Sequence, residues 1–199
     1  MAEETIRHPD MVAKLVKAPA DIISSLTEDR ADLWHAATGI AGETAELLEA
    51  LAVHPDTIDR DNVIEELGDL EFYGEQLRQR LGIDRDLVDV SNASASGTML
   101  REYAIDAAIA GGRVLDLVKK AAVYDQPLRD DDLRAALVEL DAALMSIMQV
   151  LSISRQDALD ANIAKLGQRY KDHLYSDEQA AERKDKKGKK AKPEAEANG

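Results

Sequence analysis

The chain has 199 residues and a formal net charge of −14. That charge disfavours a nucleic-acid backbone or an anionic membrane as the main partner, because both would repel an acidic surface. The absence of cysteine excludes disulfides and thiolate metal ligands. No apolar run reaches the roughly 20 residues of a membrane span. The first residues lack the apolar core of a signal peptide, so the sequence predicts a cytoplasmic protein.

Apolar residues recur at helical spacing along most of the chain, which predicts an all-α fold. Residues 11–26 are expected to form a first helical stretch that is interrupted at Pro19. Thr27 is a suitable N-cap for a second helix that ends near residue 53. An apolar stripe predicts a third helix over residues 63–81, and a short fourth helix is predicted over residues 83–92.

Small and polar residues predict a linker at 93–99, after which the pattern of the first half returns. The segment 33–92 aligns with 103–162 without a gap, and we call this pairing the repeat alignment. Identical residues meet in it at apolar and non-apolar positions alike, among them Gly42 with Gly112, Leu47 with Leu117 and Asn92 with Asn162.

We therefore interpret the chain as a tandem-duplicated helical bundle of the same type in both halves, with repeats at 9–92 and 100–183. The apolar period is lost from about residue 176, where lysine becomes frequent. We predict a disordered basic tail there, assigned to 184–199.

Two pairs of carboxylates at three-residue spacing lie on the second and third predicted helices. They are Glu43 with Glu46, and Glu66 with Asp69. Residues three apart lie close together on a helix surface, so each pair can converge on one point. Two antiparallel helices would bring the four side chains around a hard cation such as Mg²⁺. By spacing alone, a solvated acidic face is an equally good interpretation.

A family resemblance rests on two segments, LWHAATGIAGETAELLEAL (33–51) and DRDNVIEELGDLEFYGEQLRQRLGI (59–83). They resemble the MazG-like all-α nucleoside triphosphate pyrophosphohydrolases, a superfamily that includes the dimeric dUTPases. Its hallmark is ExxE, a spacer and ExxD, and here the spacer lies between Glu46 and Glu66. The end of the chain, DANIAKLGQRYKDHLYSDEQAAERKDK, is similar to the family's terminal segment. The resemblance covers about residues 9–186.

The resemblance implies hydrolysis of a (deoxy)nucleoside triphosphate to the monophosphate and pyrophosphate, in control of the nucleotide pool. It implies Mg²⁺, or Mn²⁺ as a substitute, held by Glu43, Glu46, Glu66 and Asp69. One of the carboxylates, among them Glu43, Glu46 and the neighbouring Glu49, would orient or deprotonate the attacking water. An acidic protein would bind the anionic substrate through its metal.

Residues that would hold the substrate are also implied. Asn162 and Lys165 match the family's nucleotide-holding positions, and Arg169 and Arg183 are weaker candidates for which surface pairing is the alternative. Aromatic residues beside the metal helices are candidates for contact with a base, with core packing as the alternative for each. They are Trp34, His35, Phe72 and Tyr73. The sequence indicates no base preference.

The second repeat departs from the family pattern. Arg113 stands at the position of Glu43, and Ala136 at that of Glu66, so we expect no second metal site. The first repeat lacks the terminal lysine, where Ala95 stands. Because single-repeat relatives assemble as oligomers, the chain is expected to be a homodimer or a monomer that imitates a family dimer. The alternative is a non-catalytic helical regulatory or scaffold protein derived from the enzyme.

Overall fold

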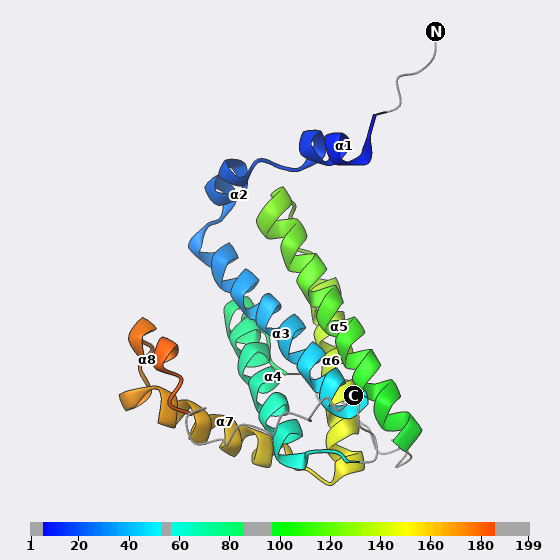
Figure 1. Ribbon diagram of the computed structural model, residues 1–199, viewed down its shortest axis with the longest axis vertical. Helices are drawn as coiled ribbons and strands as arrows, with labels where there is room; N and C mark the ends of the chain where they lie inside the picture. Colours follow the sequence, from blue (N-terminus) through cyan, green and yellow to red (C-terminus); the bar gives the residue numbers. More distant parts are fainter. Residues whose placement is uncertain (1–5, 53–56, 86–96, 186–199) are drawn as a thin grey trace, which may run out of the picture.

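The computed structural model describes residues 6–52, 57–85 and 97–185, and every regular element within these ranges is a helix (Figure 1). The predicted all-α class is therefore confirmed for this part of the chain. The elements are α1 (His8–Leu15), α2 (Pro19–Ser25), α3 (Glu28–Ala52), α4 (Arg60–Leu81), α5 (Gly97–Tyr124), α6 (Asp130–Leu151), α7 (Arg155–Arg169), the 3₁₀ turn η1 (Lys171–His173) and α8 (Asp177–Glu182).

The first two helices form an arm at one end of the molecule (Figure 1). The predicted interruption is confirmed: α1 ends at Leu15, and Pro19 is the first residue of α2. Proline is well tolerated there because the first amides of a helix have no partner within the helix. Neither helix contains a buried residue. Lys17 and Ser25 donate hydrogen bonds to the carbonyls of Val123 and Ala122, which attaches the arm to the end of α5.

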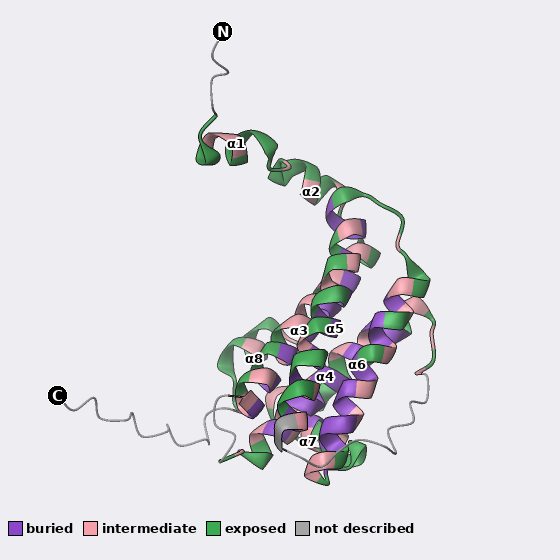
Figure 2. Cartoon of the chain, turned by 90° about the vertical axis from the view of Figure 1, so that its right-hand side faces the viewer, coloured by how far each residue is buried: buried purple, intermediate pink, exposed green. Residues whose placement is uncertain are grey.

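Four long helices form the bundle that contains the core. Helix α3 packs against both α4 and α5, and α5 packs against α6. Buried residues follow the inward faces of these helices (Figure 2), where leucine and alanine dominate. Burying a leucine side chain contributes about 1.5–3 kcal/mol. The helical spacing of these residues in the sequence is what creates the continuous apolar face.

Local capping explains where several helices begin and end. The side chain of Asp59 accepts a hydrogen bond from the Asn62 amide at 3.2 Å and starts α4. Gly82, with φ of 61°, ends α4 in the left-handed conformation that glycine adopts without strain. The expected cap at Thr27 is also confirmed, since its hydroxyl accepts from the Arg30 amide at 3.3 Å.

Helix α7 crosses to the first half of the chain and packs on α4. The crossing is close at Gly68, where an added Cβ would lie 2.6 Å from the carbonyl oxygen of Ala158. A capping box between Ser154 and Asp157 sets the first turn of α7. A segment assigned by sequence to the second repeat therefore completes the surroundings of the first.

The helix boundaries follow the repeat alignment. In that alignment the first residue of α4, Arg60, falls on Asp130, and the last, Leu81, falls on Leu151, and these two residues are the bounds of α6. Each of these helices is followed by a residue in the left-handed conformation, Gly82 and Ser152. This agreement is consistent with a tandem duplication, which stays a prediction.

Two local predictions need correction or fall outside the described ranges. Residues 97–99 of the predicted linker belong to α5, which begins at Gly97. The small residues there had suggested a later start. Residues 83–85 of the predicted fourth helix are not helical. The remainder of that helix and of the linker lies outside the described residues.

The disorder predicted for residues 184–199 is wrong at the first two of these residues, because the ordered segment that contains α8 continues to residue 185. Ser176 caps α8 by accepting from the Gln179 amide, and Asp185 forms an ion pair with Arg169 at 2.6 Å. Composition alone missed both the cap and the distant arginine. Residues 186–199 of the predicted tail lie outside the described residues.

Within the described ranges, no single helix is long and apolar enough to span a membrane. Helices α6 and α7 meet that test only as a pair, across a bend of 99°.

Candidate metal centre and substrate pocket

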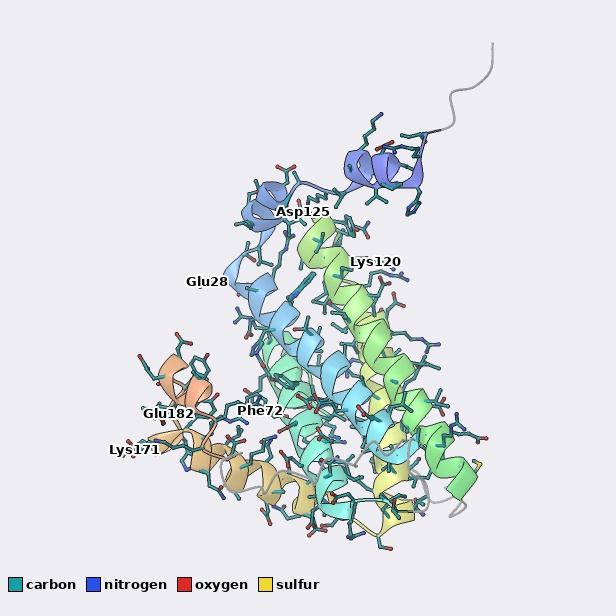
Figure 3. All side chains as sticks on the ribbon, in the orientation of Figure 1. Glu28, Phe72, Lys120, Asp125, Lys171 and Glu182 are labelled. Atoms are coloured by element: carbon teal, nitrogen blue, oxygen red, sulfur yellow. The ribbon has the colours of Figure 1, made fainter. Side chains whose placement is uncertain are left out.

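Helices α3, α4 and α7 and the segment after α7 surround a pocket of about 670 Å³. Figure 3 shows Phe72 on the side of α4 that faces α8. Carboxylates, basic groups and aromatic rings all reach this pocket. The lining residues are His35, Glu43, Glu46, Glu65, Glu66, Asp69, Phe72, Tyr73, Asn162, Ile163, Lys165, Leu166, Arg169, Tyr170, His173, Tyr175 and Arg183.

Three of the predicted carboxylates converge. One oxygen each from Glu43, Glu46 and Glu66 lies within 4.8 Å of the others, with two side chains from α3 and one from α4. Their burial differs, since Glu66 is only 6% exposed, Glu43 is half-buried and Glu46 is exposed. The three-residue spacing on α3 and the packing of α3 on α4 bring them together, as the sequence predicted.

The cluster strongly perturbs the pKa of its members. Burial, a hydrogen bond with Glu43 and the negative charges of its neighbours raise the pKa of Glu66 to about 8. Burial and the charge of Asp69 raise the pKa of Glu43, although its hydrogen bond with Glu66 acts in the opposite direction. Near neutral pH the metal-free cluster therefore retains a proton between these two side chains.

Asp69, the fourth predicted ligand, is not part of this cluster. Asn162 donates a hydrogen bond to its Oδ1 at 2.7 Å, and the Lys165 ammonium donates to its Oδ2. Both oxygens of Asp69 are thus engaged by α7. Lys165 also lies 3.1 Å from a carboxylate oxygen of Glu65, a pocket residue that the sequence analysis missed. The ExxD spacing correctly placed Asp69 on α4, but it could not indicate that residues of α7 would bind its oxygens.

Lys165 remains charged in this environment. Burial lowers the pKa of its ammonium, but hydrogen bonds and charge interactions with Asp69 and Glu65 outweigh burial and raise the pKa overall. A retained positive charge at this position is available to an anionic ligand in the same pocket. Asn162 and Lys165 therefore line the pocket, and both contact a carboxylate in this structure. Their predicted role in holding a nucleotide stays a prediction.

The other predicted site residues divide into two groups. Glu49 is exposed on α3 and does not line the pocket, and Trp34 packs against the hydrophobic core. The structure therefore does not bring these two residues to the site. The remaining candidates all line the pocket: His35, Phe72, Tyr73, Arg169 and Arg183. The guanidinium of Arg169 forms two hydrogen bonds with Asp185, at 2.8 and 2.6 Å.

An aromatic group lies at one end of the pocket. The ring of Tyr73 meets those of His35 and Phe72 edge to face, with centroids 5.6 and 5.2 Å apart. The ring of Tyr73 lies against the backbone of α3, where a Cβ on Gly39 would approach it to 2.5 Å. This contact lets an aromatic side chain of α4 pack closely on α3.

A buried ion-pair network ties the start of α7 to α4. Glu71 accepts two hydrogen bonds from Arg155, at 3.0 and 2.8 Å, and two from Arg85, both at 2.6 Å. Burial raises the pKa of Glu71, but these hydrogen bonds outweigh it and lower the pKa overall. Arg78 pairs with Asp141 at 2.7 Å beside it. The sequence pattern gives one indication of this network: the repeat alignment places Glu71 on Asp141 and Arg85 on Arg155.

The corresponding positions in the second half are occupied by ion pairs. Arg113 pairs with Glu139, and Lys120 pairs with Asp116 at 2.6 Å. Across the described ranges, the three glutamates are the only group of His, Asp or Glu side chains with the geometry for a metal ion.

Comparison with protein-family models, with curated proteins and with solved structures finds no match to this chain.

Proposed function

We propose that this protein hydrolyses a (deoxy)nucleoside triphosphate to the monophosphate and pyrophosphate in a reaction that requires Mg²⁺. One observation carries the proposal: a three-glutamate cluster, a half-buried charged lysine and a group of aromatic rings all line one pocket. A metal-bound polyphosphate attached to an aromatic base is a ligand that matches these three features. The resemblance of the sequence to MazG-like pyrophosphohydrolases supports the same substrate class.

The donor set fits a hard divalent cation. Glu43, Glu46 and Glu66 offer oxygen ligands only, which suits Mg²⁺ or Mn²⁺ better than a softer metal. The raised pKa of Glu66 supports this assignment, because a cation would stabilise the carboxylate form that the cluster otherwise disfavours. When bound, the ion would neutralise charge on the phosphates and increase the acidity of the attacking water.

The protein's own groups account for the remaining steps. Lys165 would donate a charge-assisted hydrogen bond to a phosphate oxygen, and Asn162 would hold Asp69 beside it. A glutamate of the cluster would accept the proton of the attacking water. Glu43 is a candidate for this role, because it is half-buried and lines the pocket. Glu49 is too exposed and lies outside the pocket lining.

We further propose that the site is composite, and that the chain is a tandem duplication in which each half supplies what the other lacks. The first half provides the carboxylates and the second provides α7, with Asn162 and Lys165. In the second half, the aligned positions hold the Arg113–Glu139 ion pair, which disfavours an independent metal site there. This arrangement favours a monomer that imitates a family dimer, although a homodimer of such chains is compatible with it.

The experiment is incubation with a panel of (deoxy)nucleoside triphosphates and Mg²⁺ or Mn²⁺, with the products resolved chromatographically. We expect monophosphate and pyrophosphate. Diphosphate and orthophosphate would instead indicate removal of the terminal phosphate. The absence of turnover across the panel would contradict the proposal and favour a scaffold or regulatory protein.

A further inference from the structure

A chain of polar contacts ends on His35 at the aromatic end of the pocket. Gln76 of α4 donates from Nε2 to Asp32 Oδ1 at 2.7 Å and contacts His35 Nδ1 from the same nitrogen at 3.3 Å. Arg80 holds the other oxygen of Asp32, with Nε 3.5 Å from Oδ2. Two residues of α3 and two of α4 thus form a continuous series, and only His35 among them lines the pocket.

This series determines the hydrogen-bonding role of each atom. The carboxylate of Asp32 only accepts, so the atom of Gln76 that faces it must be the amide nitrogen. An amide nitrogen only donates, so Nδ1 of His35 must accept. Neutral histidine carries one proton, which therefore resides on Nε2 and makes this nitrogen a donor.

The reversed orientation of the Gln76 amide is unfavourable. It would place the amide oxygen against a carboxylate oxygen of Asp32, with two acceptors in contact. In the orientation observed, the Gln76 oxygen is buried and makes no hydrogen bond among the described residues. The contact of the amide nitrogen with Asp32 therefore determines the orientation.

His35 lies where the base of a nucleotide would be expected if its phosphates bind at the carboxylate cluster. It precedes Glu43 on α3 by a little over two turns, which corresponds to about 12 Å along the helix axis. A nucleotide whose phosphates lie at the carboxylate cluster would extend its base over a comparable distance. Tyr73 and Phe72 provide aromatic surface at the same end of the pocket.

We propose that His35 selects the base through its Nε2–H, favouring bases with a carbonyl at pyrimidine C4 or purine C6 over those with an amino group at that position. The preferred class comprises uracil, thymine, guanine and hypoxanthine nucleotides, because a carbonyl accepts from Nε2–H and an amino group does not. The inference rests on the proposed function, since it assumes a nucleotide in this pocket. Gln76 and Asp32 act as positioning residues, because they set the tautomer of His35 without lining the pocket.

The test measures binding rather than turnover. Titration calorimetry with Mg²⁺ and α,β-imido triphosphates compares deoxyuridine with deoxycytidine and deoxyinosine with deoxyadenosine, which present oxygen or an amino group at the same ring position. We expect about ten-fold tighter binding of the carbonyl member of each pair. His35→Ala should reduce that ratio to near one, whereas His173→Ala, at a second pocket histidine, should preserve it.

The tautomer has its own readout. Nitrogen-15 NMR at pH 8 should show His35 of the wild-type protein protonated on Nε2, and Gln76→Leu should produce a mixture of tautomers and weaken discrimination. Thermal unfolding of each variant establishes that it is folded. Equal binding within both pairs, or a proton on Nδ1 in the wild type, would overturn the inference. Failure of every analogue to bind would instead contradict the proposed function.

Discussion

Replacing Glu66 by glutamine tests the physical description of the carboxylate cluster. Glu66 is buried beside Glu43 and Glu46, and its pKa is raised from 4.5 to about 8. Between these two pH values the folded protein keeps a proton that the unfolded chain has lost. The stability of the metal-free protein should therefore be full below pH 4.5 and should fall as pH rises towards 8.

The size of this change follows from the shift in pKa. Each pKa unit corresponds to about 1.4 kcal/mol, so a shift from 4.5 to about 8 corresponds to about 5 kcal/mol at most. Carboxylates with lowered pKa values behave differently. The ion pairs of Glu71, for example, lose stability only below pH 4.5 and so do not mask the effect. Glutamine cannot ionise, so Glu66→Gln should reduce the pH dependence of stability over this window. The part that remains belongs to carboxylates whose pKa is also raised, chiefly Glu43.

The assay is urea unfolding in a chelator at several pH values between 5 and 8.5, repeated with Mg²⁺. We expect the wild type to lose several kcal/mol across the series, and Mg²⁺ to restore part of that loss through binding to the folded state. Glu75→Gln, at an exposed position on the same helix, is the matched control and should behave as the wild type. A wild-type stability that does not change with pH in the chelator would refute the reasoning.

Three further predictions concern the site and its supports. Glu46→Gln should abolish Mg²⁺-dependent turnover. It should leave the free energy of unfolding of the metal-free protein unchanged or higher, because it removes charge from a like-charged cluster. Retained turnover would exclude Glu46 as a ligand. Lys165→Ala should lower kcat/KM ten-fold or more, a loss of about 1.4 kcal/mol, whereas Asp116→Ala should leave it almost unchanged in the same assay. Equal sensitivity of the two would instead indicate a site in each half. Glu71→Gln should cost about 1–3 kcal/mol in urea unfolding, because Arg155 loses its carboxylate while Arg85 keeps only Asp141. A cost well below about 1 kcal/mol would show that the network is not structural.

Local regularities in the sequence were sufficient for the long helices, although they misplaced the start of α5 and gave no indication of α8. The spacing of apolar residues predicted the long helices, and Pro19 and Thr27 predicted a break and a cap that the structure confirms. The convergence of Glu43, Glu46 and Glu66 was predictable for the same reason. Three-residue spacing places the first two on one helix face, and a short connection places the third on an adjacent antiparallel helix.

Interactions between distant segments were beyond the reach of such patterns. Asp69 has the spacing of a ligand, yet its oxygens bind Asn162 and Lys165, which lie 93 and 96 residues further along the chain. The ordered contact of Asp185 with Arg169 likewise contradicted a prediction of disorder made from composition.

The physical reason lies in how side chains find their partners. Helical periodicity and capping depend on neighbours within one or two turns, so residue order alone determines them. The partner of a buried charge depends on how two helices cross, and the crossing of α7 over α4 depends on a close approach at Gly68 that no periodicity reveals. The sequence by itself therefore determined the long helices and a convergence of carboxylates on α3 and α4. Only the tertiary structure decided that Glu43, Glu46 and Glu66 converge while Asp69 holds the lysine.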